Sequence, residues 1–462
     1  MSSQSITLHI NGQMRQLQVD PSEALIDTLR ERFELTGTHQ GCDTAQCGAC
    51  TVVIDGAAIK SCNRLTLQAA GAEVLTIEAL AAEGEPMHLI QQAFSRHHAL
   101  QCGFCTPGFV MRALAMVNEA VPAEPQAVRH ALAGNLCRCT GYEGIVNAIC
   151  EVLPVLRQAK SSAVQPHDAA QRTPSPAASN LAPRSASEPS LAVAGGGSFQ
   201  VERPASIQRA IEWLAEHQDA RPLAGGQSLL PAIRLGLAAP SHLIDLQDID
   251  ELHELRVDEG AGLVIGAMVS HAHVAADPKV RAGWPMLAAL AGGIADQQVR
   301  AVGTLGGALA NNDPAACWPA GVLASKALIT TTHRTIAADE FFTGLFDTAL
   351  ANDELITSVT FPPVLAGRYL KFEQPASRFA MVGVAVVRFE QSVRVAITGL
   401  GSGVCRWPHA EALLSERFDV AQLKGLTLDP QWASDDLHAP AEYRAHIAGV
   451  LLRRAVSDLQ PD

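Results

Sequence analysis

The sequence predicts an α+β protein built from several domains, and three observations lead to this prediction. The chain has 462 residues, enough for about three domains of roughly 150 residues each. Strand-like and helical patterns mix over residues 1–80, and helical periodicity alone follows up to residue 158. A stretch rich in Ala, Ser and Pro then precedes a half in which helical and strand-like segments alternate. The chain is therefore expected to fold as a multidomain α+β protein.

The first 80 residues predict a small sheet domain with one helix. Alternating apolar and polar side chains flank residues 11–12 (Asn-Gly) and residues 55–56 (Asp-Gly), both typical hairpin turns. Between the hairpins, Asp20 and Pro21 predict an N-cap and first helical position. Two hairpins and a helix of this length indicate an α+β domain over residues 1–80.

The rest of the chain divides by pattern into four segments. Residues 81–158 contain apolar residues at helical spacing with short loops between them, which predicts a helical bundle. Residues 159–194 have too little apolar periodicity to fold and predict a flexible linker. Two further domains are expected at 195–365 and 366–462, the second ending in a helix from about Ala441 to Leu459.

Composition argues against several classes of partner. The chain has 34 Lys and Arg against 47 Asp and Glu, a net charge of -13, which gives no attraction for nucleic acid or anionic lipid. No apolar run is long enough for a membrane span, and the first twenty residues lack the pattern of an export signal. We therefore expect a cytoplasmic protein whose eleven cysteines are reduced, metal-binding or buried.

Four cysteines of the first domain have the spacing C-x4-C-x2-C-x11-C. They are Cys42, Cys47, Cys50 and Cys62. The first three follow the plant-type ferredoxin spacing for a 2Fe-2S cluster. A structural zinc site is the alternative, although zinc knuckles usually combine two C-x2-C units. The spacing favours the cluster.

A second set of cysteines has the spacing C-x2-C-x31-C-x-C. Its members are Cys102, Cys105, Cys137 and Cys139. Each pair stands where a helix is predicted to begin, and helix N-termini favour anionic groups such as a thiolate-bound cluster. Zinc is a stronger alternative here by spacing alone. Next to the first set, these cysteines predict a second 2Fe-2S cluster and an electron-transfer protein, while Cys150, Cys317 and Cys405 are interpreted as buried thiols.

Across residues Ile6 to Leu156, both cysteine motifs in this order resemble the iron-sulfur subunit of molybdenum hydroxylases, the superfamily of xanthine dehydrogenase, aldehyde oxidase and aerobic carbon monoxide dehydrogenase. The resemblance implies a β-grasp plant-type ferredoxin domain followed by a four-helix-bundle 2Fe-2S domain. It also implies that the Cys102 cluster lies nearer the molybdenum cofactor and that the Cys42 cluster passes electrons to flavin. Gln101 matches a residue that hydrogen-bonds the pterin of a molybdenum cofactor held by another subunit.

Two glycine segments follow the linker: LAGGQSLLP from Leu223 and GTLGGALANNDPAA from Gly303. Both could present backbone N–H groups to phosphate, and two structural tight turns explain them equally well from the residues alone. Neither is a P-loop or a Rossmann fingerprint. Both resemble the FAD-binding loops of the flavin subunit of the same superfamily, closest to the carbon monoxide dehydrogenase medium-subunit type.

This second resemblance implies an α/β FAD-binding domain of the PCMH (vanillyl-alcohol-oxidase) type and a small α+β C-terminal domain. The implied FAD contacts are Ala224, Gly225, Gly226, Gln227, Ser228, Thr304, Leu305, Gly306, Gly307 and Ala308, with Asp313, Ile356 and Lys371 as further candidates. The branch with an inserted 4Fe-4S loop is set aside, because Cys317 and Cys405 cannot supply four ligands.

The resulting hypothesis is a fused iron-sulfur and flavin subunit of a molybdenum hydroxylase, an oxidoreductase. It would relay electrons from a separate large molybdenum-cofactor subunit, in a dimer of heterodimers, through two 2Fe-2S clusters to FAD and an external acceptor. The alternatives are a stand-alone iron-sulfur flavoprotein reductase and a non-catalytic redox sensor or assembly factor. The second of these predicts degraded cluster or flavin loops, and the sequence has none.

Overall fold

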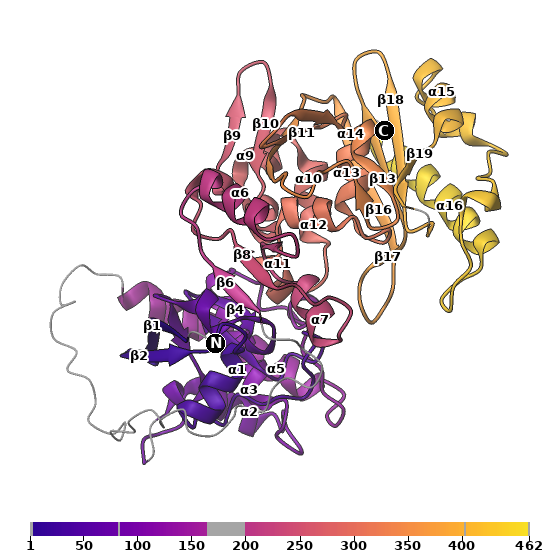
Figure 1. The fold of residues 1–462 in the computed structure, drawn as a ribbon. Helices are drawn as coiled ribbons and strands as arrows, with labels where there is room; N and C mark the ends of the chain where they lie inside the picture. Colours follow the sequence, from indigo (N-terminus) through magenta and orange to yellow (C-terminus); the bar gives the residue numbers. More distant parts are fainter. Residues whose placement is uncertain (1–2, 82–83, 164–198, 402, 461–462) are drawn as a thin grey trace. The chain divides into compact units, whose positions relative to one another are not determined.

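The computed structural model describes residues 3–81, 84–163, 199–401 and 403–460 (Figure 1). It divides into two compact units. The first comprises Met1–Val201 together with Gly226–Pro240 and Asp296–Val299, and the second comprises Glu202–Gly225, Ser241–Ala295 and Arg300–Asp462. The predicted linker, residues 159–194, falls outside the described residues except for its first positions, into which helix α5 extends as far as Ala163.

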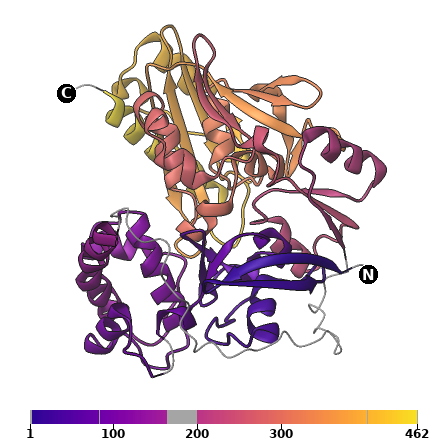
Figure 2. The same cartoon turned by 90° about the vertical axis from the view of Figure 1, so that its left-hand side faces the viewer.

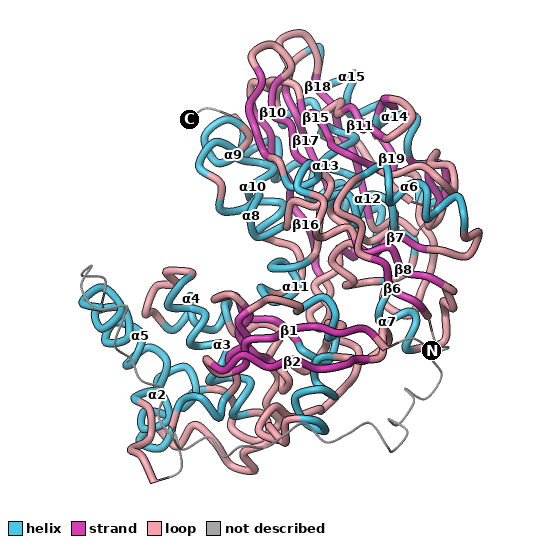
Figure 3. The backbone as a smooth tube through the Cα atoms, turned by 60° about the vertical axis from the view of Figure 1, so that its left-hand side comes forward, coloured by secondary structure: helices cyan, strands magenta, loops and turns pink. Residues whose placement is uncertain are grey.

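The first unit contains a sheet whose described strands run in the order β2-β1-β5-β3-β4. Strands β1 and β2 of this sheet are labelled in Figure 3. The strands are β1 (Gln4–Ile10), β2 (Gln13–Val19), β3 (Thr51–Ile54), β4 (Ala57–Lys60) and β5 (Glu73–Leu75). Both predicted hairpins are confirmed: β1 pairs with β2 and β3 with β4, each antiparallel. β1 and β5 pair in parallel.

The helix predicted to start at Asp20 begins later. Asp20 Oδ1 accepts a hydrogen bond from the backbone N of Ser22 at 2.8 Å and closes a turn. Ala24 then forms an antiparallel β-bridge with Leu65, so helical hydrogen bonding starts only after it. The helix that follows is α1 (Leu25–Asp27), continued by a π-helical turn, η1 (Thr28–Arg32). The apolar positions expected to face the core, such as Leu25 and Leu29, are buried.

Helices gather beside this sheet in the same unit (Figure 2). They are α2 (Leu89–Arg96), α3 (Thr106–Asn118), α4 (Pro125–Ala131) and α5 (Glu143–Ala163). Short 3-10 turns, η2 (Ser61–Asn63), η3 (Thr66–Ala69) and η4 (Ile77–Leu80), connect or follow the strands. Phe94, Phe109 and Ile149 are buried in one cluster of apolar side chains contributed by α2, α3 and α5. These helices therefore share one apolar core.

The second unit is mixed α/β. Its larger described sheet has the order β12-β11-β15-β10-β9, and a second has the order β16-β17-β18-β19. The strands are β6 (Gln200–Glu202), β7 (Arg221–Leu223), β8 (His242–Asp245), β9 (Leu255–Asp258), β10 (Gly262–Gly266), β11 (Leu328–Thr331), β12 (Thr335–Ala337), β13 (Phe342–Gly344), β14 (Asp347–Thr348), β15 (Ile356–Phe361), β16 (Ala366–Glu373), β17 (Ala380–Arg388), β18 (Val393–Thr398) and β19 (Cys405–Arg406). Residue 201 belongs to the first unit and residue 202 to the second, so β6 marks the passage between them.

Helices cover these sheets and fill the core around Trp318, Phe341 and Phe361, which are fully buried. The helices are α6 (Ile207–Glu216), α7 (Leu229–Arg234), η5 (Asp250–His253), α8 (His271–Ala276), α9 (Pro278–Gly283), α10 (Pro285–Gly292), α11 (Gln297–Val302), α12 (Leu305–Asn311), α13 (Trp318–Ala324), α14 (Ala338–Phe341), α15 (Pro408–Glu416), η6 (Val420–Leu423), η7 (Pro430–Trp432) and α16 (Ala441–Leu459). The last helix, α16, has the predicted bounds and packs on β16 and β17. Among the described residues, no helix combines the length and apolar character needed to cross a lipid bilayer.

Candidate functional site

The first set of cysteines converges at the loop that precedes β3 and at the end of β4. Cys42 Sγ accepts hydrogen bonds from the backbone N of Gln46 and of Cys47, each at 3.3 Å. The Cys47 and Cys62 thiols also hydrogen-bond Cys42 and hold the pKa of its thiol far below the usual value, because they stabilise the thiolate. The Cys62 thiol likewise lowers the pKa of Cys50. The structure therefore brings the four predicted residues together.

The second set of cysteines forms two pairs at helix starts. Cys139 Sγ lies 3.5 Å from Cys102 Sγ. Burial, together with a hydrogen bond to the Cys137 thiol, raises the pKa of Cys105 to about 12. Cys105 directly precedes α3, as the sequence predicts, and Cys137 and Cys139 lie shortly before α5. Cys102 and Cys139 are exposed, whereas Cys50 and Cys62 of the first set are buried.

Both thiol sets fit a two-iron cluster. All the cysteines are free thiols, and a 2Fe-2S cluster takes two thiolates on each iron. Each set supplies four thiols, the number of ligands that one 2Fe-2S cluster takes.

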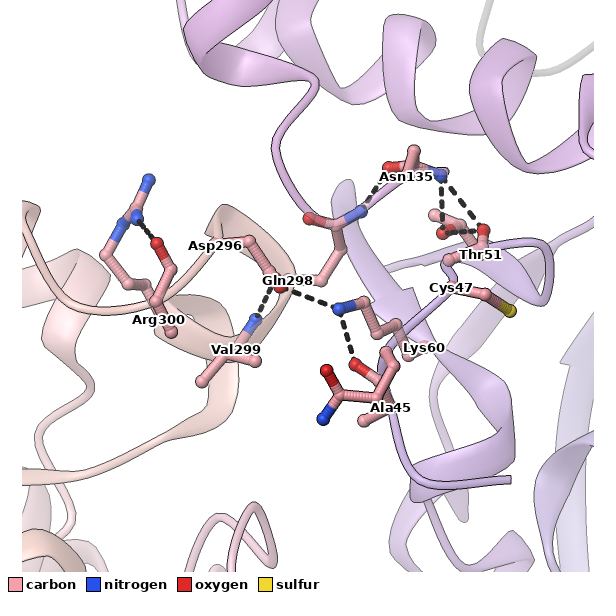
Figure 4. Close-up of polar contacts among 12 residues, drawn as sticks. Ala45, Cys47, Thr51, Lys60, Asn135, Asp296, Gln298, Val299 and Arg300 are labelled. Carbon is pink, nitrogen blue, oxygen red and sulfur yellow. Dashed lines mark hydrogen bonds and ion pairs between the residues drawn. The ribbon is translucent and has the colours of Figure 1, made fainter. Parts of the chain in front are cut away.

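The two cysteine loops are in direct contact inside the first unit. The backbone N of Leu136 donates to the carbonyl of Cys47 at 2.9 Å. Asn135 Nδ2 donates to the carbonyl of Gly48 at 2.9 Å (Figure 4). Gly48 has a φ of 70°, and a Cβ at this position would lie 2.1 Å from the carbonyl oxygen of Gly134. Only glycine permits this approach. Cys47, a ligand candidate of the first set, is thus hydrogen-bonded directly to the loop of the second set.

Aromatic packing forms a second contact between the loops. Phe104, which lies between Cys102 and Cys105, stacks on His39 with ring centroids 4.8 Å apart. His39 Nδ1 is 2.7 Å from the carbonyl oxygen of Phe104. A Cβ on Gly41 would lie 3.2 Å from the Phe104 ring. The residue before Cys42 is therefore covered by a side chain of the second cysteine motif.

The start of the first glycine segment, up to Gly225, lies in the second unit together with the second segment. A Cβ on Gly225 would lie 2.0 Å from the carbonyl oxygen of Val302, so the first segment runs against the residues that precede the second. Thr304 Oγ1 accepts a hydrogen bond from the backbone N of Gly307 at 3.1 Å. This N-cap begins α12, so residues 304–308, predicted as part of a tight turn, form the cap and first turn of a helix.

Gly226, Gln227 and Ser228 belong to the first unit and meet the first cysteine set there. Asn63, next to Cys62, donates from Nδ2 to the carbonyl of Gly226 at 3.5 Å. Asn63 is 2% exposed, and its Oδ1 has no hydrogen-bond partner among the described residues. A buried acceptor without a donor indicates a missing partner, and a bound cofactor with hydroxyl or N–H groups would supply one. This observation fits FAD at the first glycine segment.

The remaining candidate residues for cofactor binding differ in their burial and in the hydrogen-bond partners that they already have. Asp313 is largely buried, which raises the pKa of its carboxyl, and its Oδ1 accepts from the Ala315 backbone N at 2.8 Å. Ile356 is buried at the start of β15. Lys371 Nζ donates to the carbonyls of Gly293 and Arg378 at 2.7 and 2.6 Å, so these two carbonyls already engage its ammonium. Gln101 is exposed beside Cys102.

Sequence reasoning missed the polar residues around the cysteine loops. These are Lys60, Asn63, Asn135, Asp296 and Gln298. Asn63 and Asn135 stand one and two residues from predicted ligands, a local signal that could have drawn attention to them. Asp296 and Gln298 have no such signal, because they meet the cysteine loops only through the fold.

Three family models match the chain in order. They describe a 2Fe-2S iron-sulfur cluster binding domain at residues 8–80, a [2Fe-2S] binding domain at 76–150 and an FAD binding domain in molybdopterin dehydrogenase at 197–364. The caffeine dehydrogenase subunit gamma of Pseudomonas sp. (strain CBB1) is 46% identical over 164 residues, which cover 35% of this chain and 98% of that protein.

The second half has its own relatives. The carbon monoxide dehydrogenase medium chain of Afipia carboxidovorans is 36% identical over 278 residues, covering 56% of this chain and 96% of that protein. The crystal structure of quinoline 2-oxidoreductase from Pseudomonas putida 86 aligns with a TM-score of 0.53 at 28% identity, over 57% of this chain and 97% of that one. The chain therefore belongs to the xanthine and carbon monoxide dehydrogenase family of molybdenum hydroxylases, and it joins in one polypeptide the 2Fe-2S small subunit and the FAD-binding medium subunit that transfer electrons in these oxidoreductases.

Proposed function

We propose that this chain takes electrons from a large molybdenum-cofactor subunit at the Cys102 set, passes them to the Cys42 set and delivers them to FAD held by the two glycine segments. One observation carries the proposal: the Leu136 N–H donates to the Cys47 carbonyl at 2.9 Å, so the two thiol sets are linked by backbone and a single hydrogen bond. When bound, 2Fe-2S clusters supply one-electron chemistry and FAD collects electron pairs for an external acceptor.

Exposure supports the direction of transfer. Cys102 and Cys139 are exposed, and so are three large apolar side chains around them: Leu100 is 42%, Phe104 46% and Leu136 58% exposed. Exposed apolar side chains gathered at one site are typical of a surface that a partner covers. Gln101 lies on the same surface and would reach the pterin of the partner's cofactor.

Burial of the other set supports its position nearer the flavin. Cys50 and Cys62 are buried, and Asn63, which follows Cys62, donates to the Gly226 carbonyl of the first glycine segment. The residues proposed to hold FAD are those named above, from Ala224 to Ser228 and from Thr304 to Ala308, with Asp313, Ile356 and Lys371. The Lys371 ammonium donates to two carbonyls and has a third N–H, which can donate either to Glu373 Oε2, 3.4 Å from Nζ, or to the cofactor.

The finer organisation belongs to the same proposal. We assign a β-grasp ferredoxin domain to residues 1–80, a four-helix 2Fe-2S domain to 81–158, a PCMH-type FAD domain to 195–365 and a C-terminal domain to 366–462. The complex would be a dimer of heterodimers. The eleven free thiols of this chain suit a reducing compartment, so we place the protein in the cytoplasm.

Replacing one proposed ligand tests the relay. The complex is purified with its partner, and a reducing substrate is found by screening caffeine, carbon monoxide and quinoline, the compounds named in the matched relatives. In Cys47→Ala we expect flavin reduction in stopped-flow measurements to fall at least about 100-fold, while the EPR signal of the Cys102 cluster still appears on mixing, because only the second step is broken.

Cys150→Ala is the matched control, because Cys150 belongs to neither set and lies on α5. Undiminished flavin reduction in Cys47→Ala would contradict the relay. Purification of the native protein without any large subunit or molybdenum would instead favour a stand-alone reductase.

A further inference from the structure

A lysine is buried against the loop of the first cysteine set. Lys60, the last residue of β4, is 3% exposed. Its Nζ donates to the carbonyl of Ala45 and to Asp296 Oδ2, both at 2.7 Å (Figure 4). Lysine is seldom buried without a partner, and removing its charge from water is costly. A buried ion pair is weak evidence for stability, so its position next to the loop calls for another explanation.

The contact with Ala45 reaches Cys42 through one peptide group. The Ala45 carbonyl and the Gln46 N–H belong to the same planar peptide, in which the two groups point in opposite directions. Lys60 donates to the oxygen of this peptide, and the Gln46 N–H of the same peptide donates to Cys42 Sγ at 3.3 Å. The ammonium therefore fixes and polarises a hydrogen-bond donor to a proposed cluster ligand.

Backbone strain occurs at or beside both groups that accept from the Lys60 ammonium, which indicates that the surrounding fold imposes this geometry. Ala45 has a φ of 59° and Ala295, next to Asp296, a φ of 42°. Residues with a Cβ seldom adopt this left-handed region, because the side chain crowds the following carbonyl oxygen. Such strain persists only where surrounding contacts hold it, and it concentrates at functional sites.

Asp296 also contacts the loop of the second cysteine set. A Cβ on Gly134, three residues before Cys137, would lie 2.5 Å from Asp296 Cγ. Two residues further along, Gln298 Nε2 donates to Asn135 Oδ1 at 2.6 Å. The carboxylate thus lies between the Lys60 ammonium and the second loop, and it is 13% exposed.

We infer that Lys60 and Asp296 are positioning residues that set the reduction potential of the cluster held by the Cys42 set. This inference rests on the proposed function. Each one-electron reduction adds one negative charge to the cluster, and no bond forms or breaks. A nearby cation and N–H donors to sulfur stabilise that charge and raise the potential, whereas a nearby carboxylate lowers it.

The test is an EPR-monitored titration of the intact protein with dithionite, which supplies the electrons. The two cluster signals are assigned by comparison with Cys139→Ser. Lys60→Gln is expected to lower the potential of the Cys42 cluster and Asp296→Asn to raise it, with the Cys102 cluster moved less in both. The double variant removes both charges, so the two opposite shifts should partly cancel and its potential should lie between those of the single variants.

Two controls separate charge from structure. Lys60→Arg keeps the charge and should keep most of the potential even if Lys60→Gln loses its cluster. Asp339→Asn removes a carboxylate that pairs with Arg394 at 2.6 Å in the second unit, and it should leave both clusters unchanged. Iron content and thermal unfolding are measured for every variant.

The inference is overturned if the single variants shift the Cys42 cluster in the same direction, as loosened packing would, or shift neither cluster. Equal shifts of both clusters would also overturn it. A wild-type protein without two 2Fe-2S signals would instead overturn the proposed function, so the two failures are distinguishable.

Discussion

The two cysteine sets of the first unit differ in how far this chain encloses them. Cys50 and Cys62 are buried, and the loop around the first set is held by Lys60 and by the second cysteine loop. Cys102 and Cys139 are exposed among exposed apolar side chains. One site is therefore enclosed mainly by this polypeptide, whereas the other presents a side that another surface can cover.

Glycine substitutions in the two loops should show the difference between the two sets most strongly. A Cβ on Gly48 would lie 2.1 Å from the Gly134 carbonyl, whereas a Cβ on Gly103, in the second motif, would have no atom within 4 Å. Both glycines have a positive φ, of 70° and 81°. We expect Gly48→Ala to cost about 2–5 kcal/mol, from backbone strain plus overpacking, and Gly103→Ala about 1–2 kcal/mol, from strain alone.

Chemical denaturation and iron content measure the two variants side by side. Gly48→Ala should lose iron from both sites, because it separates the two loops. Equal destabilisation by the two substitutions would show that the contact between the loops contributes little.

The sequence predicted the parts of this site that are set by local spacing. Ligand spacing and turn glycines lie within a few residues of each other, so both cysteine sets and the hairpins around residues 11–12 and 55–56 could be read directly. The sequence allows a tight turn at Thr304 as one of two interpretations, because glycines disfavour helices; the structure has a helix N-cap there. The structure explains the exception: a Cβ on Gly306 would lie 2.6 Å from Ala267 Cβ, so packing requires glycine inside this helix.

Long-range polar contacts could not be predicted from the sequence. Lys60 and Asp296 are 236 positions apart, and Gln298 and Asn135 are 163 apart. No periodicity or motif joins such residues, because their contact depends on the completed fold. The helix start similarly depends on a long-range contact, because Ala24 forms a β-bridge with Leu65 just before the helix begins.

A charge on the exposed side should separate assembly from folding. Leu136 is 58% exposed, and its backbone N, not its side chain, contacts Cys47. Leu136→Asp is therefore expected to change the unfolding free energy by less than about 0.5 kcal/mol. It should weaken binding of the large subunit about tenfold or more, because a charge would be buried in the interface. Titration of the separated subunits by calorimetry measures both this variant and Leu237→Asp, a control at a residue that is 78% exposed on another segment. Equal binding by the two variants would contradict a partner surface at the Cys102 set.

The smallest expected effect is a difference in the rate of iron loss. A chelator attacks a cluster through its solvent-facing ligands, and only the second set has exposed cysteines. In the isolated chain at neutral pH, bathophenanthroline should remove iron from the Cys102 cluster a few-fold faster than from the Cys42 cluster, as followed by the two EPR signals. Adding the large subunit should slow the faster phase and leave the slower phase unchanged, because the partner would cover Cys102 and Cys139 but not Cys50 and Cys62. If the buried set loses its iron first, exposure does not control access, and the contrast between the two sites has to be sought in the stability of their loops instead.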